Sequence, residues 1–466
     1  MTRPANDAEV RSPSTFASGA LVLALAALGS GACAGYRADL LPEVQAVAPP
    51  LALDAPRLRA AAEELHRNTH PPIPIDLSDG LDPDEAAVLA VLLNPDLVAA
   101  RDAHGEGQAQ VMIGGILPNP VFSLGIDQPF GPNSTGMKTL TNLSLAVDLK
   151  PYVARSARQR AAVAGLEQID LGIAWQEWQV AEQARLLVVR LGWIRKRLKL
   201  AHDELAFAEQ SVKSMVSAGR AGDATIEQIG VQRAAVESVR RALNQLEQAD
   251  AEAESTLRAL LGNPELGKLE VAEPRPSGDH EDAVTSVNAC LEGRLDLAGL
   301  RRGYEAGEEQ LRAAVLDQFP AVTIGVAYQR NEVALNFLGG FISMALPVFN
   351  HNQHQVELGV ATRRRLGHEY DARVAKARGD LDRLLRFATL LTRQVADAHR
   401  SIAPLEELEL QERAAVARGD IGRLPYQIVR SALFDQRLQE AAVSQAIAET
   451  RVGLEYTCGG EPGRQP

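Results

Sequence analysis

The chain is poor in cysteine, in aromatic side chains and in surplus positive charge. Its three cysteines, Cys33, Cys290 and Cys458, are too few and too scattered for a disulfide framework or a zinc site, and Cys290 and Cys458 are expected to be free thiols or incidental. Aromatic residues make up only 4 % of the 466 residues, which disfavours several thick globular cores. The net charge of −12 and the lack of a basic stripe argue against nucleic acid as a partner.

Long apolar runs and enzyme motifs are missing as well. No stretch of eighteen or more apolar residues occurs, which excludes a transmembrane helix. Residues 219–222 (GRAG) lack the preceding strand and the following Lys-Ser/Thr of a phosphate loop, and no Ser-His-Asp arrangement can be proposed. His351 and His354 have no third ligand nearby, so they are expected to be solvated, with a metal site as the weaker alternative. The sequence predicts no catalytic residues, no cofactor and no metal.

The amino terminus has the pattern of an export signal. Residues 16–29 (FASGALVLALAALG) form an apolar run of signal-peptide length, and small residues directly precede Cys33. Small residues before a cysteine resemble a bacterial lipobox, which implies removal of residues 1–32 and lipidation of Cys33 with palmitate. Ordinary cleavage after Ala34 stays the alternative. The alanine after the cysteine favours the outer membrane, since an aspartate there would be the usual signal for retention in the inner membrane.

One stretch of the chain occurs twice. Residues 94–126 align without a gap with residues 294–326, and seven positions are identical: Asp96/Asp296, Leu97/Leu297, Arg101/Arg301, Gly107/Gly307, Gln110/Gln310, Pro120/Pro320 and Gly125/Gly325. In both copies a segment of helical period leads into a proline, Pro120 or Pro320, and then into strict alternation. A repeat of this length predicts a duplicated structural unit. The expected divisions are a signal peptide (1–32), an extended leader (33–82), a first repeat (83–262), a linker (263–283), a second repeat (284–457) and a tail (458–466).

Four alternating segments are expected to be strands in two hairpins, over residues 119–150 and 319–350. One face of these strands is apolar and the other is small or polar, which predicts a membrane barrel with lipid outside and water inside. A soluble sandwich edge has the same alternation and stays the alternative. Four strands cannot close a barrel, so several chains must contribute to it. The residues expected to face lipid are Phe122, Leu124, Leu143, Leu145, Val147, Val322, Ile324, Val326, Ile342, Met344 and Leu346, and those expected in interfacial girdles are Phe122, Phe130, Phe319, Phe337, Phe341 and Phe349.

The rest of each repeat has helical period. A helix is expected to begin at Asp82, where an N-cap acceptor precedes Pro83 and two acids, and to end near Gly114. Each hairpin is followed by a very long helix and then a second one, which makes a coiled-coil pair: Arg155–Ala218 with Thr225–Leu261, and His354–Arg418 with Gly422–Glu455. The turns within the pairs match at the same 200-residue offset, and glycine there allows a left-handed backbone: Gly219, Gly222, Gly419 and Gly422.

Together these segments resemble the TolC-like outer-membrane efflux family. The resemblance covers residues 83–454 and is carried by residues 89–101 (LAVLLNPDLVAAR), 117–120 (LPNP), 346–350 (LPVFN) and the twin glycine turns. It implies a homotrimer in which each chain gives four strands to a 12-stranded barrel in outer-membrane lipid. It also implies a long periplasmic helical barrel whose tip, formed by the paired-helix turns, meets a periplasmic adaptor and an inner-membrane pump. A lipidated member resembles the metal- and drug-efflux branch, which works with proton-driven pumps.

The chain departs from the family at the tip. In some members, acidic residues shortly after the second tip glycine constrict the entrance, and the corresponding positions here are Pro425 and Ile428. This chain therefore has no carboxylate ring at those two positions. The nearby Asp223 and Asp420 are interpreted as solvated turn acids.

The fold class expected is mainly α with β, internally duplicated. The function expected is a passive exit duct of a tripartite efflux system for metal ions, drugs or other small solutes, lipid-anchored in the outer membrane and extending into the periplasm. A periplasmic coiled-coil adaptor or scaffold without a barrel is the main alternative, because it would also have long paired helices. A soluble enzyme with a helical domain is opposed by the lack of convergent polar residues.

Overall fold

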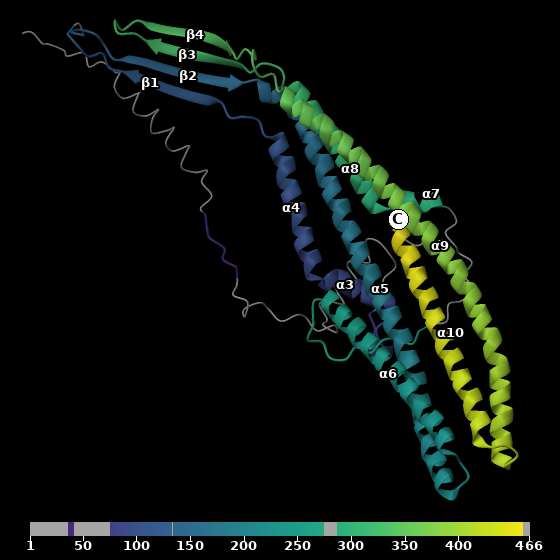
Figure 1. Cartoon of the computed structure of the whole chain (residues 1–466). Coiled ribbons are helices and arrows are strands. Elements are labelled where there is room, and N and C mark those ends of the chain that lie inside the picture. Colours follow the sequence, from purple (N-terminus) through teal and green to yellow (C-terminus); the bar gives the residue numbers. More distant parts are fainter. Residues whose placement is uncertain (1–35, 42–74, 133, 275–286, 460–466) are drawn as a thin grey trace, which may run out of the picture. The chain divides into compact units, whose positions relative to one another are not determined.

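A computed structural model describes residues 36–41, 75–132, 134–274 and 287–459 (Figure 1). The chain forms two compact units, residues 1–50 and 51–466, and every helix and strand described below belongs to the second. The predicted signal peptide, Cys33 and most of the predicted leader lie outside the described residues, as does part of the predicted linker.

The first repeat begins with a short 3-10 helix, η2 (Leu77–Asp79), followed by α3 (Pro83–Leu93) and α4 (Pro95–Gly115). Asp82 caps α3 with a capping box, as expected for that helix start. The expected single helix from Asp82 to Gly114 is wrong, because the chain leaves helical geometry at Asn94. Pro95 disfavours helical backbone in the residue before it, and the Asn94 side chain accepts a hydrogen bond from the Leu97 N–H (3.1 Å) to start a new helix.

The same order of elements then occurs in both repeats. In the first, β1 (Val121–Asp127), β2 (Leu140–Asp148), α5 (Lys150–Ala221) and α6 (Ile226–Leu260) follow α4. In the second, the order is α7 (Val287–Glu292), α8 (Leu295–Leu316), β3 (Val322–Arg330), β4 (Asn336–Met344), α9 (Gln353–Arg418) and α10 (Arg423–Cys458). The last helix ends one residue beyond the predicted second repeat. The predicted fold class, mainly helical with an internal duplication and four strands, is confirmed.

The long helices pack against one another along their length. The helix α5 has 72 residues, which corresponds to about 108 Å at 1.5 Å per residue, and α9 has 66 residues and continues through Pro404. The apolar residues that recur at 3-4 spacing along α6 are buried: Val236, Val239, Leu243, Leu246, Ala253 and Leu257. Asp250, which interrupts this spacing, binds Arg195 of α5 (3.0 Å). Phe434 of α10 joins α6 residues in one apolar cluster, so the two helix pairs are in contact. No helix in the described part of the chain combines the length and apolarity needed to cross a membrane.

Candidate functional site

The four strands form one antiparallel sheet in the order β1-β2-β3-β4 (Figure 1). The register pairs Phe122 with Leu145, and Leu145 in turn with Val326. Because residues directly opposite each other in a sheet point to the same side, these pairs place the predicted lipid-facing residues of the different strands on one face. Further rows of the same face are Leu124–Leu143–Tyr328–Leu338, Val147–Ile324–Ile342 and Val322–Met344.

This apolar face is uncovered in the single chain. Leu145 is 47 % exposed, Val326 56 % and Ile342 77 %, although each lies within its strand and Leu145 and Val326 lie near the middle of theirs. Exposed apolar side chains that form a contiguous face across four strands mark a surface that contacts lipid or another protein. The face therefore has the character that the alternation predicts.

The opposite face carries mainly small and polar side chains. One row is Ser123–Ser144–Ala327–Gly339, and the ring of Phe341 lies over Gly325, where a Cβ would meet it at 2.6 Å. Phe337 and Phe341 belong to this face, as the alternation in β4 predicts for Phe341. The interfacial girdles stay a prediction. Leu346 lies beyond the end of β4 at Met344, so it is not a strand residue as predicted. It is 69 % exposed.

The passage from helix to strand is built alike in both repeats. Pro120 and Pro320 lie between the end of the preceding helix and the start of β1 or β3. The carbonyl of Gly115 at the end of α4 accepts a hydrogen bond from Arg155 Nε (2.9 Å), and the carbonyl of Ala314 near the end of α8 accepts one from Asn352 Nδ2 (2.9 Å). Each terminal carbonyl is thus satisfied from the next long helix or its N-cap, which fixes the direction of the chain as it enters the sheet.

The two helix-pair turns have the same backbone but not the expected alignment. The long helices end at Gly222 (φ +88°) and Gly419 (φ +81°), and in each turn the next N–H, of Asp223 or Asp420, donates to a carbonyl five residues earlier (2.9 Å). The equivalent glycines are therefore Gly222 and Gly419, at an offset of 197 rather than 200. The expected pairing of Gly219 with Gly419, and of Gly222 with Gly422, is wrong. Both aspartates are exposed, in agreement with solvated turn acids.

The other two turn glycines have different roles. Gly219 lies within α5, and a Cβ there would meet Ile229 Cδ1 of α6 at 2.8 Å, so it permits close packing of the pair. Gly422 has φ −70° and is the N-cap of α10, a position that Thr225 occupies before α6. Among the four turn glycines, left-handed backbone is therefore required only at Gly222 and Gly419.

Replacing Gly222 with alanine is expected to destabilise the turn by about 1–2 kcal/mol, because a side chain disfavours left-handed backbone even where no neighbouring atom is close. The matched control is Gly422→Thr, which copies Thr225 and adds an N-cap acceptor, and we expect it to be neutral or stabilising. Urea unfolding and hydrogen exchange at the turn measure both. Equal losses in the two variants would contradict the assignment.

A buried charge cluster joins α3, α5 and α10. The Glu182 side chain is 1 % exposed, and its Oε1 accepts a hydrogen bond from Arg185 Nη1 (2.7 Å), while its Oε2 has no partner among the described residues. Arg185 also binds Asp84 (2.8 Å), and Glu455 lies at 4.0 Å from it. Burial raises the pKa of Glu182 from 4.5 to about 7, although the Arg185 guanidinium acts to lower it.

The folded chain is expected to lose stability between about pH 4.5 and pH 7. Over this range Glu182 would ionise in the unfolded chain but keep its proton in the folded one, so folding binds a proton and becomes less favourable as the pH rises. The loss amounts to about 3 kcal/mol, since one pKa unit corresponds to about 1.4 kcal/mol, and it is complete above pH 7. Glu182→Gln should flatten this slope in urea unfolding measured from pH 4.5 to 8. An unchanged slope in the variant would assign the titration to another group.

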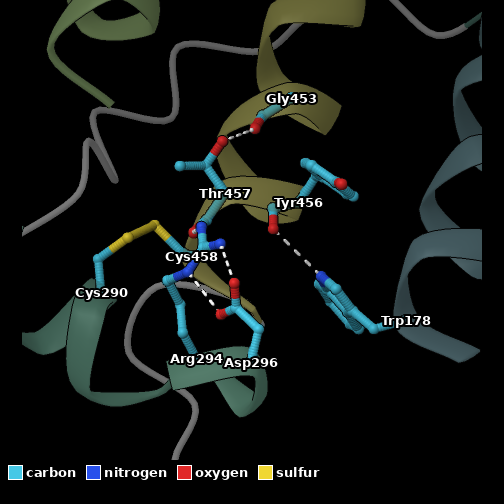
Figure 2. Close-up of a disulfide and its surroundings, with 8 residues drawn as sticks. All are labelled: Trp178, Cys290, Arg294, Asp296, Gly453, Tyr456, Thr457 and Cys458. Atoms are coloured by element: carbon cyan, nitrogen blue, oxygen red, sulfur yellow. Dashed lines mark hydrogen bonds and ion pairs between the residues drawn. A yellow bond between two sulfur atoms is a disulfide. The ribbon is translucent and has the colours of Figure 1, made fainter. Parts of the chain in front are cut away.

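The end of α10 is held by residues from several elements, shown in Figure 2. Cys290 of α7 forms a disulfide with Cys458, and both are buried, so the expectation of free or incidental thiols is wrong. Arg294 Nη1 donates to the carbonyl of Thr457 (2.6 Å), and Trp178 Nε1 of α5 donates to that of Tyr456 (3.2 Å). The Tyr456 carbonyl also accepts the N–H of Gly459, the C-cap of α10 (3.4 Å). We call the following group the α10 anchor: Trp178, Cys290, Arg294, Asp296, Tyr456 and Cys458.

The charges of the α10 anchor are paired. Arg294 makes a bidentate ion pair with Asp296 (2.8 and 2.9 Å), and Arg373 of α9 binds the same carboxylate (3.0 Å). Although burial acts to raise it, these guanidinium groups hold the pKa of Asp296 below its ordinary range. Arg294 also lies over the ring of Trp175, with 4.8 Å to its centroid. The anchor therefore connects α5, α7, α8, α9 and α10.

The remaining sequence candidates carry no chemistry in the described residues. His351 is exposed, and its Nδ1 lies 3.1 Å from the carbonyl oxygen of Pro347. Among the residues that the structure describes, no group of three or more His, Cys, Asp or Glu side chains could hold a metal ion. Sequence reasoning missed the α10 anchor and the Glu182 cluster. For the disulfide a signal existed, because a chain predicted to be exported reaches an oxidising compartment.

Comparison with known proteins agrees with this architecture. No protein-family model matches the chain. The pyoverdine export outer membrane protein OpmQ of Pseudomonas aeruginosa is 25 % identical over 403 residues, which cover 80 % of this chain and 83 % of that protein. Among solved structures, the CmeC outer membrane channel of Campylobacter jejuni has a TM-score of 0.69 at 13 % identity, covering 83 % of this chain and 88 % of CmeC. The MtrE outer membrane channel of Neisseria gonorrhoeae, in its open state, has a TM-score of 0.64 at 15 % identity, covering 82 % and 90 %. The chain shares the fold of these channels.

Proposed function

We infer that this chain, which belongs to the TolC-like outer-membrane efflux family, is the outer-membrane channel of a tripartite efflux system. Three copies would together form a barrel in the outer membrane, continued by their long helices in the periplasm. Solutes would pass through this duct passively, with the energy supplied by an inner-membrane pump. The family likeness supports a proton-driven pump and a lipid anchor at Cys33 as further parts of this proposal.

The observation that carries the proposal is the sheet. It has one exposed apolar face and one face of mainly small or polar side chains. Its outer strands β1 and β4 each keep an edge without a partner among the described residues. An open edge in lipid would leave backbone groups without hydrogen bonds, which is costly. Pairing β4 of one copy with β1 of the next removes the open edges. Three copies then give twelve strands, above the smallest known barrel of about eight.

The helix-pair turns support docking of a periplasmic adaptor. Val231 of α6 and Ile428 of α10 are at equivalent positions in the two repeats, and they are 59 % and 60 % exposed. Ile226, at the start of α6, is 86 % exposed. Apolar side chains exposed at both turns would supply contacts for an adaptor. Movement of the turns on docking would open the duct.

The substrate class proposed is small solutes, including metal ions and drugs. OpmQ is named for the export of pyoverdine, which adds a secreted small molecule to that class. Such a duct would leave selection to the pump.

Deletion and complementation in the source bacterium test the proposed function. Loss of the chain should raise the cellular content of solutes that the partner pump exports, and the wild-type chain should restore the original level. The restored chain should fractionate with the outer membrane. Full activity from a chain found only in the soluble periplasm would instead support the adaptor or scaffold alternative.

A further inference from the structure

The α10 anchor has a counterpart in the first repeat. Asn94 Nδ2 donates to the carbonyl of Leu260 (3.0 Å) in the same way that Arg294 Nη1 donates to that of Thr457 (2.6 Å). The last helix of each repeat is followed by a glycine with left-handed backbone, Gly262 (φ +66°) after α6 and Gly459 (φ +69°) after α10. Asn94 and Arg294, near the starts of the two repeats, are 200 residues apart in sequence. Leu260 and Thr457, at the ends of the last helices, are 197 residues apart.

These offsets also give each cysteine of the disulfide a counterpart. Cys290 corresponds to Ala90 of α3, and Cys458 corresponds to Leu261 at the end of α6. Ala90 and Leu261 are 0 % and 1 % exposed and belong to the same apolar cluster. The disulfide therefore occupies the place where the first repeat has a buried apolar pair.

The apolar surroundings of the two places differ in size. The cluster around Ala90 and Leu261 has thirteen buried residues, contributed mainly by α3, α5 and α6. Among the described residues, the apolar cluster that contains the disulfide has one further buried member, Leu381, with Leu385 and Leu454 partly buried against it. Because stabilisation by burial scales with the apolar area removed from water, the second repeat holds its last helix by less apolar packing than the first.

We propose that the Cys290–Cys458 disulfide forms after export and is structural. It holds the end of α10 in place, as the larger apolar cluster holds the end of α6. It closes a loop with a sequence separation of 168 residues, which includes α8, β3, β4, α9 and α10. Such a cross-link restricts the unfolded chain and so favours the folded one. In a channel that opens by movement of the helix-pair turns, which rests on the function proposed above, the bond keeps the far end of α10 in place.

The bond forms by thiol–disulfide exchange with a periplasmic protein oxidant that carries a disulfide. The thiolate of one cysteine attacks that disulfide, which gives a mixed disulfide and releases one thiol of the oxidant. The thiolate of the other cysteine then attacks the sulfur of the first and releases the second thiol. Two electrons and two protons pass from the chain to the oxidant, which leaves as a dithiol.

Mass spectrometry of protein isolated from the membrane tests whether the bond exists. Free thiols are alkylated before digestion without reductant, and we expect a cross-linked pair of peptides that contain Cys290 and Cys458. The pair should separate after reduction. Recovery of both cysteines as alkylated thiols without reduction would overturn the proposal. This result is independent of channel activity, so a channel that conducts nothing but holds the bond would overturn only the function proposed above.

Two sets of variants test what the bond does. Reduction of the wild-type chain should lower its melting midpoint by about 5 °C. C290A/C458L, which copies the apolar pair of the first repeat, should melt between the oxidised and reduced wild type and should not respond to reductant. C290S/C458S, which places polar groups there, should melt no higher than the reduced wild type. A melting midpoint of the wild type that does not change when the bond is cut would overturn the structural role.

The correspondence itself is tested by adding two cysteines to the first repeat. A90C/L261C is expected to form a second disulfide when the chain is exported, seen as one more cross-linked peptide pair. The control is A90C alone, which should give an alkylated thiol. Alkylation of both new thiols in the double variant would show that the two places are not equivalent, and would remove the basis of the comparison.

Discussion

Replacing Leu145 with arginine is expected to prevent stable insertion of the protein into the outer membrane. Leu145 lies in the middle of β2, between Phe122 and Val326 on the apolar face. An arginine that faces lipid at the midplane of a membrane costs about 2–4 kcal/mol, and three copies in one barrel would raise this to about 6–12 kcal/mol. The amount of trimer in the outer-membrane fraction measures the effect, and we expect it to fall close to zero.

The neighbouring residue provides the matched control. Ser144→Arg adds the same side chain one position away in the same strand, but on the face of small and polar residues where Ser144 pairs with Ser123 and Ala327. There the guanidinium would reach water in the lumen, so the yield of trimer should stay near that of the wild type. Equal losses in Leu145→Arg and Ser144→Arg would mean that both faces are buried, and a barrel with a watery lumen would then be excluded.

Replacing Arg294 with alanine is expected to destabilise the folded chain by about 3–5 kcal/mol. The Arg294 side chain is 8 % exposed and that of Asp296 is 5 % exposed. Loss of the guanidinium leaves a buried carboxylate with only Arg373 as a charged partner, and it also frees the Thr457 carbonyl at the end of α10. Urea unfolding measures the loss. Hydrogen exchange should also become faster in the last turns of α10.

Arg302→Ala is the control for this second variant. Arg302 is on α8, the helix that Arg294 precedes as its N-cap. It binds Glu167 and Glu305, but its side chain is 47 % exposed. Ion pairs at the surface contribute little to stability because water and salt screen them, so this variant should unfold nearly as the wild type does. If Arg302→Ala cost as much as Arg294→Ala, burial of the ion pair would not explain the effect.

Much of the sheet and of the helix pairs is predictable from the sequence, because both follow from periodicity. Alternation at Leu143, Leu145 and Val147 assigns the apolar face of β2, and the observed register with β1 and β3 keeps those residues on one side. The 3-4 spacing of apolar residues likewise predicts the buried seam of α6. In these elements one local pattern determines both the secondary structure and the direction of the side chains.

The errors at the turns have a physical cause. Glycines at Gly219 and Gly222 have the same spacing as Gly419 and Gly422, so identity alone favours an offset of 200. In both turns the residue with left-handed backbone is the glycine directly before an aspartate, Gly222 or Gly419. The change in offset from 200 to 197 therefore occurs within the long helices. Three residues are close to one helical turn, so a change of this size keeps the apolar face nearly in phase and leaves no mark in the hydrophobic pattern.

The misses at the α10 anchor and at Glu182 depend on tertiary contacts. Cys290 and Cys458 are far apart in sequence, and only the return of α10 to the start of its own repeat brings them together. The burial of Glu182 follows from the packing of α3 and α10 on α5, since a helix of 72 residues presents many equivalent glutamates. Periodicity predicts which side of a helix is apolar, but it does not predict which charges the neighbouring elements cover.

The native mass of the detergent-extracted protein tests the central claim most directly. We predict that the protein is found in the outer-membrane fraction. After subtraction of bound detergent, its mass should be about three times that of one mature chain, which is the 50.1 kDa chain less the predicted signal peptide, residues 1–32. More than one copy is required because one sheet of four strands leaves both edges open, and three is the number in the channel that we propose. A soluble monomer would contradict the account.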